Sequence, residues 1–272
     1  TMVQRMSHPQ LTKVYDVGTW QGRDFLAMEY VKGETLYSFF QRLRREEKFL
    51  PLTLAVRWVT QIGSLLDYVD RFPHHDSQVP LRWKHRRLLM DQLLVRPDLN
   101  IKVLGVGTPR HFTYLDSQSL QDYRRPWRYL PQEVLRGEVT SEESDNDLWV
   151  LGLLLYELST SCKAFRYDLQ ENISALSEIG NVVHGRLRTP SELREDFPLT
   201  LQRLIGFAMH PDPTKRFSTI SDFLDGLSLF LALERLRSLE VSSSVWMQQA
   251  RECLHDNNLA TLLGMLRLGG PE

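Results

Sequence analysis

An unbroken apolar run of eight residues, from Leu148 to Leu155, constrains the fold of this chain more than any other feature. The run is too short to cross a bilayer, because a membrane-spanning helix needs about 20 apolar residues. It ends at Tyr156-Glu157, and a helix that is apolar all round is typical of a protein core. The chain is therefore expected to form a sizeable helical body around this segment.

A second helix is indicated by an amphipathic pattern over residues 52–69. Its apolar residues recur at threes and fours and so share one helix face; they are Leu54, Trp58, Ile62, Leu65, Leu66 and Val69. The helix that contains the apolar run is expected to span residues 147–160, and the other helices that the sequence predicts span residues 35–43, 169–185, 199–209, 220–239 and 243–268. Two strand hairpins are also expected, and they pair residues 13–18 with 25–30 and residues 92–95 with 101–106.

Charge and cysteine content argue against several classes of function. The formal net charge is −1, which gives no overall attraction for nucleic acid. The two cysteines, Cys162 and Cys253, do not form a C-x-x-C pair, so neither a disulfide framework nor a zinc site is expected. No leader or membrane-spanning segment is visible. We therefore expect a cytoplasmic protein that binds no nucleic acid and does not insert into a membrane.

Four segments, in matching order and spacing, resemble the bacterial-type Ser/Thr protein kinases. The first runs from His8 to Leu36 and ends in FLAMEYVKGETL. The others are YLPQEVLRG at 129–137, DLWVLG at 147–152 and HPDPTKR at 210–216. The resemblance covers residues 1 to about 232 and implies an α+β fold of the protein-kinase type.

The resemblance also implies how the chain is divided. Residues 1–32 correspond to a remnant of the kinase small lobe, namely the end of the C-helix, two strands and the hinge. Residues 33–232 correspond to the mostly helical large lobe. Residues 233–272 extend beyond the match as a C-terminal helical extension. Only the last part of the small lobe is thus expected within this chain.

The residues that matter most for kinase chemistry are replaced. The catalytic loop, H-R-D-L-x-x-x-N in the family, reads HRRLLMDQ here, with Arg87 at the position of the proton-accepting Asp and Gln92 at the metal-binding Asn. Gly105 stands at the metal-binding Asp of the D-F-G motif. Arginine has no lone pair to accept a proton, and glycine has no oxygen ligand for magnesium. These changes predict a degenerate pseudokinase that is not an enzyme, with Asp91 as the only substitute base in the loop.

Other residues of the kinase pattern are kept. Glu133 and Arg216 match an ion pair that is buried in kinases, and Asp147 matches an Asp of the central helix that accepts backbone hydrogen bonds. A buried carboxylate requires such partners. We predict that these three residues have structural roles.

The resemblance also places a nucleotide pocket. It would lie against the hinge backbone at Tyr30 and Val31, with Met28 at its back and Leu94 as its floor. Because the phosphate-binding and metal-binding groups are missing from the chain, we expect no cofactor, and only weak ATP binding is left open; magnesium is not expected.

These observations favour a pseudokinase that acts as a protein-binding scaffold or allosteric regulator. The alternatives are an unconventional Ser/Thr kinase or ATP-binding switch with weak activity, and a structural subunit of a larger assembly. A protein partner is expected, and the apolar pattern within residues 243–268 could serve as its surface or pack on the chain's own large lobe. The sequence leaves the oligomeric state open.

Overall fold

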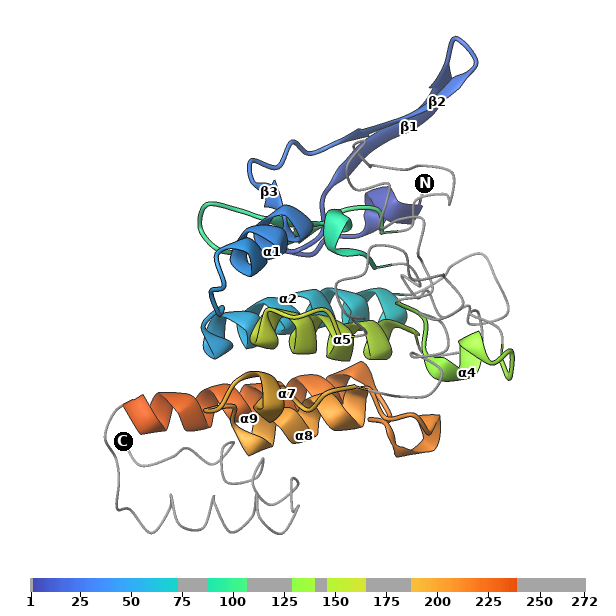
Figure 1. The fold of residues 1–272 in the computed structure, drawn as a ribbon. Helices are drawn as coiled ribbons and strands as arrows, with labels where there is room; N and C mark the ends of the chain where they lie inside the picture. The colour runs from blue at the N-terminus through green and yellow to red at the C-terminus, as the bar shows by residue number, and fades with distance from the viewer. Residues whose placement is uncertain (1, 73–87, 107–128, 140–145, 165–186, 239–272) are drawn as a thin grey trace, which may run out of the picture.

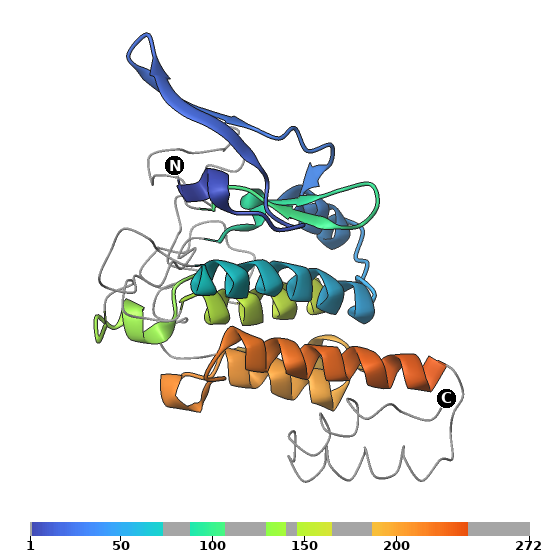
Figure 2. The same cartoon turned by 180° about the vertical axis from the view of Figure 1, so that it is seen from behind.

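The computed structural model describes residues 2–72, 88–106, 129–139, 146–164 and 187–238. Its strands lie at one end of the molecule and its long helices are stacked in layers below them (Figures 1 and 2). A hairpin projects from the strand end, away from the helices.

Most of the described chain is helical. The longer helices are α1 (Leu36–Arg45), α2 (Leu52–Arg71), α5 (Asn146–Thr160), α8 (Leu199–Ala208) and α9 (Ile220–Ser238). The single-turn elements are η1 (Met2–Arg5), η2 (Met90–Gln92), α4 (Gln132–Leu135), α7 (Pro190–Leu193) and η4 (Pro213–Lys215). The five longer helices confirm the predicted helices at these positions, whereas the helices expected at 169–185 and 243–268 fall outside the described residues.

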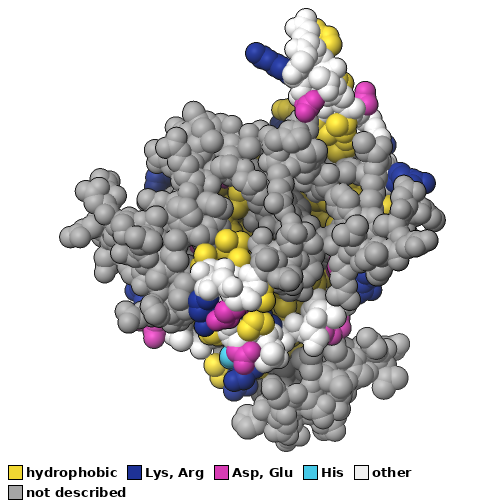
Figure 3. All heavy atoms as spheres, turned by 90° about the vertical axis from the view of Figure 1, so that its right-hand side faces the viewer, with side chains coloured by type: hydrophobic (Ala, Val, Ile, Leu, Met, Phe, Trp, Pro, Cys, Tyr) yellow, Lys and Arg dark blue, Asp and Glu magenta, His cyan; other side chains and the backbone are white. Residues whose placement is uncertain are grey.

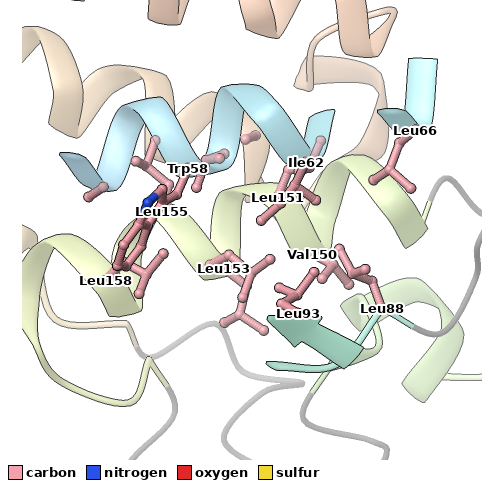
Figure 4. Packing of buried hydrophobic residues seen from close by; sticks show 14 of the residues in the cluster. Trp58, Ile62, Leu66, Leu88, Leu93, Val150, Leu151, Leu153, Leu155 and Leu158 are labelled. Atoms are coloured by element: carbon pink, nitrogen blue, oxygen red, sulfur yellow. The ribbon is translucent and has the colours of Figure 1, made fainter. Parts of the chain in front are cut away.

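The core forms around α5, as the apolar run predicts. All 15 residues of α5 are buried. The apolar stripe of α2 packs against it, with Trp58 and Ile62 beside Leu151 and Leu155 (Figure 4). Helices α8 and α9 pack against each other. Helix α8 also packs against α5, and α9 packs against α2. Burial of this many large side chains supplies the main driving force for folding.

The first predicted hairpin is confirmed. Strands β1 (Val14–Trp20) and β2 (Arg23–Met28) pair antiparallel. The two turn residues, Gln21 and Gly22, have φ values of 50° and 74°, as expected for a two-residue turn that follows the twist of the strands. The hairpin stands clear of the body and carries exposed hydrophobic side chains (Figure 3); these are Tyr15, Trp20 and Phe25.

The second predicted hairpin is part of a three-stranded antiparallel sheet. Its strands, in the order β3-β4-β5, are β3 (Glu34–Thr35), β4 (Leu93–Val95) and β5 (Ile101–Val103). Helix α2 holds the turn between β4 and β5: Trp58 Nε1 donates to the Leu99 carbonyl at 2.8 Å, and the Gln61 side-chain oxygen accepts from the Ile101 N–H at 2.8 Å. The two-residue strand β3 was not predicted.

The division of the chain at residues 32 and 232 stays a prediction. Helix α9 continues without a break across residue 232. In the part of the chain that the structure describes, no helix is long and apolar enough to span a membrane.

Candidate functional site

Two of the replaced kinase positions lie side by side. Helix η2 leads into β4 and ends at Gln92, whose backbone carbonyl accepts a hydrogen bond from the Leu104 N–H at 2.7 Å. This bond brings Gly105 next to the Gln92 backbone. The third replaced position, Arg87, falls outside the described residues.

The groups at these two positions do not fit a magnesium ion. Gly105 has a φ of 80° and offers no side-chain oxygen. The side-chain oxygen of Gln92 accepts the Leu89 N–H at 3.2 Å, so it serves the local turn. Magnesium requires near-octahedral oxygen ligation with carboxylates among its protein ligands. Across the described segments, no group of three or more His, Cys, Asp or Glu side chains is arranged to hold a metal.

Asp91 lies within the same turn and is half-buried. It directly precedes Gln92 in the chain and is the carboxylate nearest in the chain to that replaced position. Asp91 is the residue that the sequence predicted as a substitute base. In the structure it lies just before β4, and Gly105 lies just after β5, the strand that pairs with β4.

The residues predicted to line a nucleotide pocket come from the end of β2, the segment after it, and β4. Met28 ends β2, Val31 lies three residues after it, and Leu94 occupies the middle of β4; all three are half-buried. Tyr30 is 89% exposed and points its side chain to solvent. Leu94 pairs with Lys102 across the sheet, and directly opposite residues share one face of an antiparallel pair.

The sequence did not predict an ion pair that lies next to these residues, between Lys102 and Glu29. Lys102 Nζ contacts Glu29 Oε2 at 2.9 Å and also donates to the Leu11 carbonyl at 3.1 Å. Burial alone would raise the pKa of the Glu29 carboxyl, but hydrogen bonds from Lys102 and from the Lys13 backbone outweigh this effect, and the pKa lies below its ordinary value of 4.5. The only sign of this ion pair in the sequence was the charged Lys102 between the apolar Ile101 and Val103. That pattern did not indicate Glu29 as the partner.

The ion pair implied by the resemblance is present in the structure. Arg216 donates from both terminal nitrogens to the two oxygens of Glu133 at 2.7 Å each, and both side chains are less than 5% exposed. The Arg216 Nε also donates to the His210 carbonyl at 2.8 Å. The guanidinium lies over the ring of Trp149, 4.9 Å from its centroid. The pair thus joins α4, α5 and the turn around η4.

Asp147 lies in the first turn of α5 and is buried, as expected for the central-helix residue it matches. That Asp147, Glu133 and Arg216 stabilise the fold stays a prediction.

Comparisons with known proteins agree with this geometry. The family described as "Protein kinase domain" matches residues 1–225. The tyrosine-protein kinase MasK of Myxococcus xanthus is 26% identical over 231 residues, which cover 85% of this chain and 34% of MasK. The serine/threonine-protein kinase PrkC of Bacillus subtilis is 24% identical over 266 residues, covering 95% of this chain and 37% of PrkC. The chain therefore spans about a third of the length of these curated relatives.

Proposed function

Because the chain belongs to the protein kinase family, we propose that it is a kinase-family domain that binds a protein partner and acts as a scaffold or allosteric regulator. The α+β protein-kinase-like fold expected from the sequence is confirmed by the family match and by the arrangement of strands and helices.

The expectation that the chain is not an enzyme is wrong. The relatives that it matches are named as tyrosine- and serine/threonine-protein kinases, so the family is one of enzymes. The replaced groups at Arg87, Gln92 and Gly105 therefore do not by themselves exclude activity. A replaced group changes the chemistry at its own position only, and Asp91 is the carboxylate that we propose below as a substitute base.

One contrast carries the proposal of a regulatory, partner-binding role. The buried pair of Glu133 and Arg216 keeps full bidentate geometry, whereas Gly105 provides no ligand and the Gln92 oxygen is used within its own turn. A partner-binding domain needs a stable fold and a surface, but it does not need a metal site.

A capture experiment tests this role. The immobilised chain is incubated with extract of its native cells, and the partner is purified and titrated against the chain by calorimetry, with and without ATP and magnesium. We expect affinity to change less than twofold on adding the nucleotide and in the Gly105→Asp variant, because neither is needed for binding. The proposal fails if no partner binds in the micromolar range, or if binding requires ATP.

Phosphate transfer by an altered site is the second candidate function. It is favoured by the kinase names of the relatives and by the half-buried Asp91 beside the replaced positions. In this case Asp91→Asn should reduce transfer of radioactive phosphate from ATP to a protein substrate by about 10²–10⁴-fold, the usual contribution of a positioned acid or base.

The matched control for that experiment is Asp98→Asn, which changes an exposed carboxylate at the turn between β4 and β5. Its transfer rate should equal that of the unchanged chain. Equal rates for Asp91→Asn and the unchanged chain would remove Asp91 as the base.

The proposal also covers the surface that the partner contacts and the cellular compartment. We propose that a partner uses the apolar residues within 243–268, and that the domain works in the cytoplasm. A structural subunit of a larger assembly is the remaining alternative; it predicts that the isolated chain is unstable without its partner.

A further inference from the structure

The β1–β2 hairpin depends on its root for its position. Within the described segments it forms a sheet of two strands only, and an isolated two-stranded hairpin is marginally stable in water. Its outer part projects beyond the body (Figures 1 and 3). Among the described residues, β1 is held by a hydrogen bond from Gln4 Nε2 in η1 to the Tyr15 carbonyl at 2.9 Å and by the contacts where the two strands meet the β3-β4-β5 sheet.

Backbone hydrogen bonds form the first layer of this root. The Val103 N–H donates to the Gln10 carbonyl at 2.7 Å, and the Thr12 N–H donates to the Val103 carbonyl at 3.1 Å. The Glu29 N–H donates to the Lys13 carbonyl at 2.8 Å. The first two bonds attach the segment before β1 to β5, and the third joins that segment to the residue after β2.

The ion pair of Lys102 and Glu29 forms the second layer and connects all three pieces. Lys102 lies on β5, and its ammonium contacts both the Leu11 carbonyl and the Glu29 carboxylate. The same carboxylate oxygen accepts the Lys13 N–H at 3.2 Å. The Lys102 side chain is 13% exposed and that of Glu29 is 30% exposed, so the pair is shielded from water more than a surface pair and is weakened less by salt.

We infer that Lys102 and Glu29 form a latch that holds the root of the hairpin against β5. Breaking the latch removes the side-chain layer of the root, so the backbone bonds of the first layer open more often while the helical body stays folded. Because Lys102 pairs with Leu94 across the sheet, the latch also fixes the hinge relative to the predicted floor of the pocket. The inference does not depend on the proposed function, since it concerns the contact between two parts of the fold.

Amide hydrogen exchange tests the latch on the whole chain. Lys102→Met keeps the aliphatic stem and removes the charge, and Glu29→Gln keeps the shape and removes the opposite charge. Each is expected to accelerate exchange at the root amides of Thr12, Glu29 and Val103 by tenfold or more, while amides of α5 change less than twofold. The double variant should be no faster than the faster single variant, because both substitutions break the same contact.

The matched control is Arg42→Met, which breaks a bidentate ion pair with Glu34 that is 36–44% exposed. This variant should leave exchange at the hairpin root unchanged. The inference is overturned if Lys102→Met leaves the root amides within twofold of the unchanged chain. It is also overturned if exchange in α5 rises as much as at the root, since that would mean a general loss of stability.

Discussion

Replacing Glu133 with alanine is expected to destabilise the chain by about 3–5 kcal/mol, the usual cost of leaving one charge of a buried pair without its partner. In the unchanged chain both oxygens of Glu133 accept hydrogen bonds from Arg216 at 2.7 Å, and both side chains are less than 5% exposed. The alanine variant would leave the guanidinium buried against Trp149 and the His210 carbonyl, with no opposite charge. Thermal denaturation should show the melting temperature falling by roughly 10 °C.

An exposed pair of the same geometry provides the control. Arg42 donates to both oxygens of Glu34 at 2.7 and 2.8 Å, but these side chains are 44% and 36% exposed. Glu34→Ala should therefore cost only about 0–1 kcal/mol. The double variant Glu133→Met/Arg216→Met should recover much of the lost stability, because no unpaired charge remains. Equal melting temperatures for Glu133→Ala and Glu34→Ala would contradict a structural role for the buried pair.

Trp58→Ala is expected to have a similarly large effect, about 3–5 kcal/mol of destabilisation. The Trp58 side chain is fully buried between α2 and its neighbours, and it packs edge to face against Phe39 with ring centroids 5.2 Å apart. Its Nε1 also donates to the Leu99 carbonyl in the turn between β4 and β5. The substitution removes both the packing and the bond that docks the strand hairpin on α2. Urea denaturation followed by far-ultraviolet circular dichroism measures the loss.

Trp58→Phe separates these two contributions. It keeps most of the apolar packing and removes the hydrogen bond, so it should cost about 1–2 kcal/mol. If phenylalanine is as destabilising as alanine, the hydrogen bond to Leu99 and not the packing determines the stability of this region. If both variants are as stable as the unchanged chain, Trp58 has no part in holding the core.

The features that could be predicted are those that leave a local pattern. The stripe of α2 and the apolar run of α5 are periodic over many residues, and helix geometry converts that period into a buried face. Gly22 marked the tight turn of the first hairpin because glycine adopts positive φ at little cost. The ion pair of Glu133 and Arg216 came from the family resemblance, since nothing near either residue indicates a partner 83 positions away.

The features that were missed depend on contacts between distant residues. Strand β3 has only two residues and exists because β4 pairs with it. Gln92 was predicted as a replacement for the metal-binding Asn, but the sequence did not indicate that its side-chain oxygen accepts the Leu89 N–H. Only the arrangement of the turn in space makes that acceptor available.

The sequence by itself determined the helical body, the two hairpins and the replacement of three kinase residues, because helix period, turn chemistry and side-chain identity are properties of short segments. The tertiary structure decided which charges meet. Lys102 and Glu29 are 73 positions apart in the chain, and they are joined because β5, the segment before β1 and the hinge converge at the hairpin root. Such a contact arises from the packing of whole elements and leaves no periodic signal in the sequence.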